Sequence, residues 1–278
     1  MKIPKQIYFI HYEKDKEVVT NFLFINYICI KSALINNLNY KVNVITNNKN
    51  ILNDYDIKDK VNLIIEEPIK ELFGNKVTVI QHSADIRRCQ LLIERGGIFC
   101  DTVILCVKSF DNVIDDDYDL IVGSETKKRL GIAFLAAKLN LQIFKDWLDN
   151  YKNFEGNKFE GYNEKDATIN IKKFKYKDER AKQLNYYLKD STYLFNELVL
   201  KDKDLKILKL SKKQTYPFST FWMDVNDFFI NDVTYPDSVI HHLWQSLLKN
   251  KLSKFSKEDL NNEGYFYKKC KEIYEVKI

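Results

Sequence analysis

Arginine, glycine and proline are scarce in this sequence. The 278 residues include 8 Gly and 4 Pro, and the 44 cations are almost all Lys, with Arg only at positions 87, 88, 95, 129 and 180. Few breakers and a hydrophobic fraction of 45% exclude a disordered or low-complexity chain. Nucleic-acid-binding surfaces usually concentrate Arg on one face, and here 39 acids nearly balance the cations. A nucleic-acid-binding protein is therefore supported only by the net charge of +5, and we expect no nucleic-acid partner.

A disulfide framework and long apolar runs are also missing. The five cysteines, at 29, 89, 100, 106 and 270, include no CxxC pair, which indicates a reducing compartment. The sequence shows no secretory leader, and the apolar stretch 22–30 contains Asn26 and is too short to span a bilayer. These features predict a cytoplasmic protein. The basic run Lys172–Lys182 is typical of a solvated face; if it has a function, that function would be attraction to the inner surface of an anionic membrane.

Strand-like and helix-like segments alternate in the first half of the chain. This pattern predicts an α/β fold whose mainly parallel sheet is covered by helices on both faces. In such sheets ligands bind at the carboxyl ends of the strands. The expected strands are 6–11, 41–46, 61–65, 98–100, 103–107, 130–138, 205–210 and 239–244, and the expected helices are 18–37, 83–95, 142–153, 182–200 and 258–276.

Residues 82–101 carry the most informative pattern. Ser83 is expected to cap a helix that ends at Gly96, and Asp85 and Arg88, three residues apart, share one of its faces. An ordinary surface ion pair explains that spacing alone. However, a double glycine and a short apolar strand follow, and Asp101 stands at the end of that strand. An acid at this position favours a ligand site.

The residues His-Ser-Ala-Asp-Ile-Arg-Arg at 82–88, followed by Gly-Gly-Ile-Phe-Cys-Asp-Thr at 96–102, resemble the signature of glycosyltransferase family 32. Weaker similarities lie at 3–10, at 131–138, and in the C-terminal Tyr-Pro-Phe and His-His elements. The resemblance implies a GT-A fold, Rossmann-like, with a helical C-terminal extension on the acceptor side. Residues 1–125 would form the nucleotide-sugar-binding core, and 126–278 the remainder of one integrated domain.

The resemblance also implies an activity, the transfer of a sugar from a UDP-sugar to a saccharide or glycolipid acceptor with retention of anomeric configuration. Retention by front-face attack and retention through a covalent intermediate both remain open. Asp85 would accept hydrogen bonds from sugar hydroxyls, and Arg88 would hold a hydroxyl or the diphosphate. Asp101, with Thr102 beside it, would bind the ribose and a divalent cation, Mn²⁺ or Mg²⁺.

The sequence departs from the family at position 103, where Val103 replaces the second acid of the Asp-x-Asp motif. Valine cannot bind a metal, so either a substitute ligand completes a cation site, or cationic and hydroxyl side chains neutralise the leaving group instead. His242 is one candidate and its neighbour His241 the other, although adjacent strand residues face opposite sides. The alternative is a pseudoenzyme of the same fold that binds nucleotide sugars and transfers nothing.

Further donor contacts are expected at both ends of the chain. Phe9, His11 and Tyr12 close the first strand, where GT-A folds hold the nucleotide base. Ser246 is expected to bind a phosphate oxygen. Trp244 is expected to stand in for the tryptophan that the family places after that serine, because Leu247 is found there.

Overall fold

A computed structural model describes residues 2–13, 22–77, 79–154, 189–216 and 222–278. Its strands are β1 (Gln6–His11), β2 (Lys41–Thr46), β3 (Asn62–Ile65), β4 (Glu71–Leu72), β5 (Asn75–Lys76), β6 (Gly97–Cys100), β7 (Ile104–Cys106), β8 (Leu120–Thr126), β9 (Arg129–Ala137), β10 (Ile207–Leu210) and β11 (Ile240–His242). Its helices are α1 (Phe24–Asn36), α2 (Ile80–Glu94), α3 (Gln142–Asn150), α5 (Leu194–Lys201), α6 (Lys212–Thr215), α7 (Trp222–Ile230), α8 (Gln245–Leu252) and α9 (Tyr265–Glu275). Short helical turns occur at Phe110–Asn112, Tyr151–Asn153, Lys189–Tyr193 and Glu258–Asn261.

A seven-stranded sheet in the order β10-β8-β9-β6-β1-β2-β3 forms the centre of the molecule. Strands β6, β1, β2 and β3 run parallel, as do β10 and β8, and β9 is antiparallel to both of its neighbours. Strands from both 1–125 and 126–278 therefore lie in one sheet. The predicted strands 6–11 and 41–46 are confirmed at the same residues.

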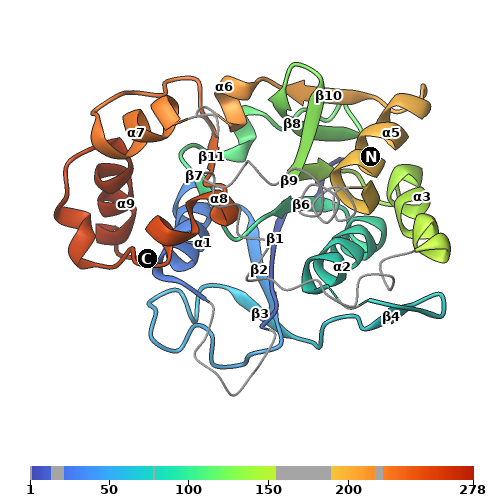
Figure 1. The fold of residues 1–278 in the computed structure, drawn as a ribbon, viewed down its shortest axis with the longest axis horizontal. Coiled ribbons are helices and arrows are strands. Elements are labelled where there is room, and N and C mark those ends of the chain that lie inside the picture. Colours follow the sequence, from blue (N-terminus) through green and yellow to red (C-terminus); the bar gives the residue numbers. More distant parts are fainter. Residues whose placement is uncertain (1, 14–21, 78, 155–188, 217–221) are drawn as a thin grey trace, which may run out of the picture.

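Helices cover the two faces of this sheet, as Figure 1 shows, with α1 and α9 on one side and α2, α3 and α5 on the other. Alternate residues of β1 explain the two layers, because successive side chains of a strand point to opposite faces. Ile7 and Phe9 pack into the core beside α1, and Tyr8 and Ile10 into the core beside α2. All five cysteines are buried as free thiols.

The run of predicted strands suggested that β7 belongs to the central sheet. In the structure it lies outside that sheet. It pairs antiparallel with β11, with Cys106 opposite Ile240 and Ile104 opposite His242. The chain turns after Asp101, where Ile104 N donates to Asp101 O at 2.9 Å, and this turn directs β7 toward the C-terminal residues. Strand β11, which lies within the predicted strand 239–244, thus holds the backbone that follows Asp101 through its pairing with β7.

The predicted start of helix α2 is wrong. The helix begins at Ile80, and Ser83 lies inside it rather than at its N-cap. The Ser83 hydroxyl is used elsewhere, because it accepts a hydrogen bond of 2.6 Å from Ile69 N. The predicted stop is confirmed, since α2 ends at Glu94 and Gly96 N donates to Leu92 O at 3.2 Å.

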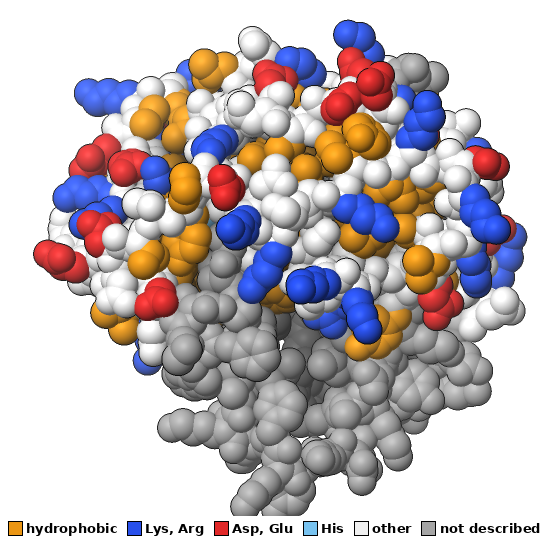
Figure 2. Space-filling view, turned by 90° about the horizontal axis from the view of Figure 1, so that it is seen from above, with side chains coloured by type: hydrophobic (Ala, Val, Ile, Leu, Met, Phe, Trp, Pro, Cys, Tyr) orange, Lys and Arg blue, Asp and Glu red, His pale blue; other side chains and the backbone are white. Residues whose placement is uncertain are grey.

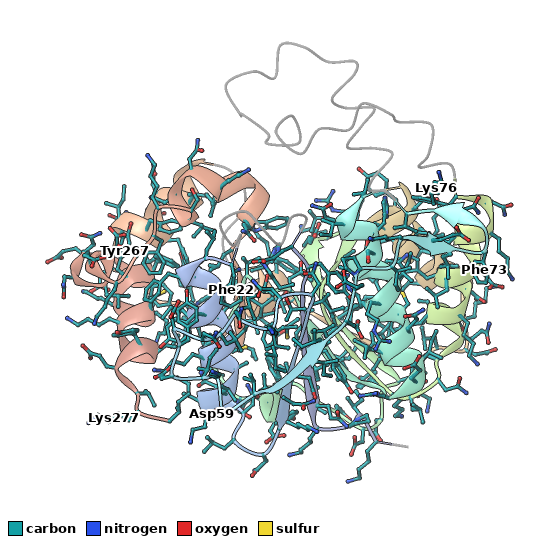
Figure 3. The ribbon with its side chains drawn as sticks, turned by 90° about the horizontal axis from the view of Figure 1, so that it is seen from below. Phe22, Asp59, Phe73, Lys76, Tyr267 and Lys277 are labelled. Atoms are coloured by element: carbon teal, nitrogen blue, oxygen red, sulfur yellow. The ribbon has the colours of Figure 1, made fainter. Side chains whose placement is uncertain are left out.

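Two strand features were not predicted, namely β8, which pairs with both β9 and β10, and the small β4–β5 hairpin. Phe73 and Lys76 of this hairpin lie at an outer edge of the molecule, whereas Phe22 lies near its middle (Figure 3). The basic run Lys172–Lys182 lies outside the described residues. Among the residues described, no helix is long and apolar enough to cross a membrane.

Candidate functional site

A double-glycine turn places Asp101 at the carboxyl end of β6. Gly96 has φ +60° and Gly97 φ +105°, a region that L side chains avoid. A Cβ on Gly97 would lie 2.8 Å from Gln6 O. The turn can therefore pack against β1 only because Gly97 has no side chain. Asp101 N then donates to Ala133 O at 2.8 Å, which ties the strand end to β9.

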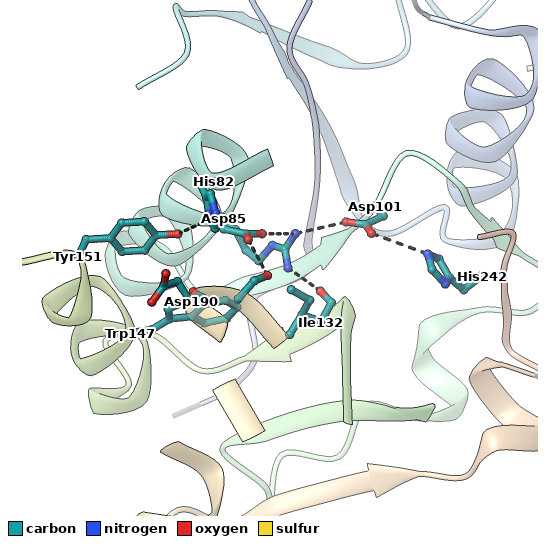
Figure 4. Close-up of polar contacts among 10 residues, drawn as sticks. His82, Asp85, Asp101, Ile132, Trp147, Tyr151, Asp190 and His242 are labelled. Carbon is teal, nitrogen blue, oxygen red and sulfur yellow. Dashed lines mark hydrogen bonds and ion pairs between the residues drawn. The ribbon is translucent and has the colours of Figure 1, made fainter. Parts of the chain in front are cut away.

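Arg88 joins the helix to this strand end. Its Nη2 lies 3.1 Å from Asp85 Oδ1 and 3.3 Å from Asp101 Oδ1, and its Nη1 donates to Ile132 O at 2.8 Å. The guanidinium also packs over the Phe99 ring, with 3.9 Å from its carbon to the ring centroid. The predicted trio is thus assembled as acid, cation and acid, and Figure 4 shows its contacts extending from Asp85 to Asp101 and His242.

The two carboxylates of this trio differ in exposure. The Asp85 side chain is only 2% exposed, and the Asp101 side chain is 35% exposed. Asp85 Oδ2 accepts a hydrogen bond of 2.7 Å from Ser191 Oγ, a residue that sequence reasoning missed. Ser191 lies 106 positions away in a turn with no motif, so no local pattern identifies it. Asp101 is therefore the acid of the trio that a ligand can reach.

Desolvation raises the pKa of Asp101 to about 6. The Arg88 guanidinium opposes that rise, and the carboxylates of Asp85 and Glu125 add to it. At neutral pH Asp101 is consequently charged, but it lies closer to its titration range than an ordinary carboxylate does. Perturbed acids of this kind are frequent where ligands or protons are handled.

His242 faces the second oxygen of Asp101, with 3.8 Å between Nε2 and Oδ2. Burial lowers the pKa of His242 to about 3, so the imidazole is neutral at physiological pH. His241 points to the other side, as expected for strand neighbours, and its Nε2 lies 2.8 Å from Tyr265 OH. Of the two histidines, His242 belongs to the site.

Trp244 lies beside His242, with ring centroids 4.6 Å apart, and adopts the left-handed φ of +49°. Non-glycine residues in that region often occur at functional sites. Within the described part of the chain, His242 Nδ1 and Trp244 Nε1 are buried without a hydrogen-bond partner. Ser246 falls within α8, but its side chain lies outside the described residues.

The end of β1 lies on the same edge of the sheet. Tyr12 OH donates to Glu66 Oε1 at 2.7 Å, and burial lowers the pKa of His11 to about 4. Among the residues described, His11 Nε2 is buried and has no hydrogen-bond partner. Phe9, in contrast, is wholly buried in the core, which leaves no side-chain surface for a nucleotide base. Thr102 is nearly buried, and its carbonyl accepts from Asn26 Nδ2 at 3.0 Å.

The fold is α/β, and the candidate site lies at the carboxyl ends of parallel strands, which is where sheets of this kind bind ligands. Residues 26–120 match the family described as "Glycosyltransferase sugar-binding region containing DXD motif". The match includes Asp85, Arg88 and Asp101. It confirms the predicted resemblance over this segment and indicates a transferase enzyme. No curated protein matches the chain.

Several solved structures that align with this chain are described as glycosyltransferases. GlyE of Streptococcus pneumoniae TIGR4 aligns with a TM-score of 0.50 at 11% identity, and the alignment covers 99% of this chain and 61% of GlyE. The PaToxG glycosyltransferase aligns at 17% identity over 86% of this chain and 90% of its own, with a TM-score of 0.45. The galactosyltransferase LgtC, in complex with donor and acceptor sugar analogs, aligns at 11% identity over 97% and 95%, with a TM-score of 0.47. The likeness to GlyE, with the sheet order, confirms the predicted GT-A fold class.

Proposed function

We propose that this chain transfers a sugar from a UDP-sugar to a saccharide or lipid-linked saccharide acceptor and retains the anomeric configuration. One observation carries the proposal. Asp101, the partly exposed acid at the end of β6, is joined by Arg88 to Asp85 within the segment that matches the sugar-binding family. A charged acid beside a fixed cation suits a ligand that presents both hydroxyls and phosphates.

The donor would lie along the strand ends. His11 and Tyr12 would form one side, near the nucleotide base. Asp101 and Thr102 would contact the ribose. The indole N–H of Trp244 would donate a hydrogen bond to a phosphate oxygen. Ser246 retains its proposed phosphate contact at the start of α8.

Asp85 takes a different role from the one expected. Direct contact with sugar hydroxyls does not fit a side chain that is 2% exposed and whose two oxygens are engaged by Arg88 and Ser191. We assign Asp85 to holding the guanidinium of Arg88. Arg88, whose own side chain is 5% exposed, would then hold Asp101 in place, and its positive charge would stabilise the diphosphate as UDP departs.

The residues present fit a divalent cation only if the donor shares in binding it. Asp101 supplies one carboxylate and His242 a neutral imidazole, whereas Val103 is buried in the core. Among the residues described, no group of three or more His, Cys, Asp or Glu is placed to hold a metal ion. Cations bound by one carboxylate and completed by substrate phosphates are common, and the imidazole favours Mn²⁺ over Mg²⁺. Such a cation would neutralise the leaving diphosphate.

The reaction requires the anomeric carbon of the donor to exchange its bond to UDP for a bond to an acceptor hydroxyl on the same face. Front-face attack and a covalent intermediate meet that requirement equally well. Either route passes through an oxocarbenium-like state in which negative charge builds up on the departing diphosphate. The positive charge of Arg88, which three oxygen partners fix beside Asp101, would stabilise that diphosphate.

The acceptor or its membrane would meet a basic face. Figure 2 shows Lys and Arg side chains gathered on the side that carries β8, β10 and α6. Lys127, Lys128, Lys206, Lys209 and Lys213 are exposed there. They support an anionic acceptor or peripheral attachment to an anionic membrane on the cytoplasmic side. Co-sedimentation with phosphatidylglycerol vesicles should exceed that with neutral vesicles and should fall at high salt.

The donor assignment is tested by thermal shift with a panel of UDP-sugars, GDP-sugars and free UDP, with and without Mn²⁺. We expect UDP and one or more UDP-sugars to raise the melting temperature, more so with Mn²⁺, and GDP-sugars to have little effect. Any UDP-sugar that binds is then followed by UDP release, with and without added oligosaccharide or glycolipid acceptors. The absence of both a shift and release with every UDP-sugar contradicts the proposal.

A further inference from the structure

Ser191 lies in a turn that is anchored on helix α3. The residues Lys189–Tyr193 form a short π-helical turn, interrupted at Ser191, whose backbone is not helical. Trp147 Nε1 donates to Asp190 O at 3.0 Å, and Asn150 Nδ2 donates to Asp190 Oδ1 at 2.9 Å. Asp190, the residue before Ser191, is thus held through both its backbone carbonyl and its side-chain carboxylate.

The residue after Ser191 is anchored on strand β9. Asn196 Nδ2 donates to Thr192 O at 2.7 Å and to Leu130 O at 3.0 Å, and Leu130 N donates to Asn196 Oδ1 at 2.8 Å. Ser191 itself is fully buried. A hydroxyl that is enclosed and fixed on both sides has little freedom to turn away from its partner.

The partner of this hydroxyl is the buried acid of the site. Ser191 Oγ donates to Asp85 Oδ2 at 2.7 Å, and Asp85 Oδ1 lies 3.1 Å from Arg88 Nη2. The same Nη2 lies 3.3 Å from Asp101 Oδ1. A connected path therefore leads from Ser191 through Asp85 and Arg88 to the exposed acid. Loss of the Ser191 hydroxyl would leave one oxygen of a buried carboxylate without this donor.

We propose that Ser191 is a positioning residue for the transfer reaction, acting through Asp85 to hold Arg88 against Asp101. This inference rests on the proposed function. Groups that stabilise developing charge must be held within fractions of an ångström, and hydrogen bonds behind them supply that precision. A carboxylate fixed at one oxygen only can rotate, and the guanidinium that it holds would rotate with it.

The test is a comparison of Ser191→Ala with the wild type in the UDP-release assay. We expect kcat to fall about tenfold while the KM for the donor changes by no more than about twofold, because the loss affects orientation during UDP departure. Ser32→Ala is the matched control. It removes another fully buried serine hydroxyl, one that bonds Cys29 O and Cys106 N away from the site, and should keep the wild-type kcat.

A second comparison separates positioning from a general effect on folding. In an Asp85→Asn background the Ser191→Ala change should lower the rate by less than about twofold, because the path is already broken at its middle. Single-turnover rates at high enzyme concentration keep slow variants measurable. A tenfold loss in both backgrounds, or an unchanged kcat in Ser191→Ala, overturns the inference. A wild type that neither binds nor turns over any UDP-sugar overturns the proposed function instead, and the inference with it.

Discussion

Arg88 Nη2 lies 3.3 Å from Asp101 Oδ1, although 13 positions separate the two residues in the chain. The end of α2, the double-glycine turn and β6 lie between them. The contact brings a buried cation against a carboxylate that is about one-third exposed, so the charged form of that carboxylate is stabilised from the protein side. The outer side of the carboxylate is left for a ligand.

Removal of this carboxylate should abolish most of the activity. Asp101→Asn keeps the size of the side chain but removes the charge, and we expect kcat/KM for UDP release to fall about 100-fold or more. Asp232→Asn is the control, because Asp232 is an exposed acid paired with Lys268, and its replacement should leave turnover unchanged. An Asp101→Asn variant with wild-type turnover would remove Asp101 from the proposed site.

The activity should decline on the acid side with an apparent pKa near 6, the value to which desolvation raises the pKa of Asp101. The ionised carboxylate is the active form, so the rate should fall as the pH drops through that value. Arg88→Met removes the cation that lowers this pKa and should move the acid limb to higher pH. Affinity for a UDP-sugar, whose diphosphate has no group that titrates near pH 6, measured by calorimetry across pH 4.5–8 checks both statements even where turnover is slow. An acid-side decline with an apparent pKa near 4 in the wild type contradicts this assignment. An apparent pKa that is unchanged in Arg88→Met contradicts it as well.

The turn before β6 should be intolerant of a side chain. Gly97→Ala places a Cβ 2.8 Å from Gln6 O at a φ of +105°, and we expect it to lower the free energy of unfolding by about 2 kcal/mol or more. Gly74→Ala is the comparison, since Gly74 also has positive φ, at +80°, but a Cβ there meets nothing within 4 Å. Strain alone should make the Gly74→Ala loss about 1 kcal/mol. Urea unfolding of both variants gives the difference, and equal losses would show that crowding at Gly97 is unimportant.

Buried His241 should make the fold sensitive to acid. Burial lowers its pKa to about 3, below the value of about 6.5 expected in the unfolded chain. Between those values the unfolded state binds a proton that the folded state does not, so stability is fully present above pH 6.5 and falls as the pH drops. The loss attributable to His241 is about 1.4 kcal/mol per pH unit.

The His241→Phe variant tests this sensitivity, because it removes the titrating group and should flatten the pH dependence of unfolding by that amount. Tyr265→Phe removes the hydroxyl that contacts His241 Nε2 but leaves the histidine, and should keep the wild-type slope. Urea unfolding between pH 4.5 and 6.5 measures all three proteins. Parallel curves for the wild type and His241→Phe would show that His241 is not the source of the effect.

The parts of the fold that sequence reasoning located carry local signals. Gln6–His11 and Lys41–Thr46 are apolar runs that are buried as central strands, and Gly96 ends α2 because it adopts a positive φ. The N-terminus of α2 was misplaced because serine is a good capping residue, yet Ser83 bonds Ile69 of a distant segment instead. Strand β8 was missed, and its ladder with β9 is irregular between Val122 and Thr126.

The residues of the candidate site also divide into those with a local sequence signal and those that depend on distant contacts. Asp85, Arg88 and Asp101 fall within twenty residues, and helix spacing, the double-glycine turn and the short strand together bring them close. Ser191 and the orientation of His242 depend on contacts across more than one hundred positions, for which one sequence contains no signal. Burial of Phe9 and Asp85 depends on how completely neighbouring elements cover them, and residue type does not determine that.

The pairing of β7 with β11 also governs when the site can form as the chain leaves the ribosome. Strands β1, β2, β3 and β6 are complete within the first 100 residues, so four of the seven strands of the central sheet can assemble early. Strand β7 can pair only after Ile240–His242 has been synthesised. Asp101 likewise gains its contact with His242 only then. Nascent chains that end before β11 should therefore fold their first strands while the turn after Asp101 stays unpaired. The proposed nucleotide-sugar binding would then be acquired only after residues 240–242 have been synthesised.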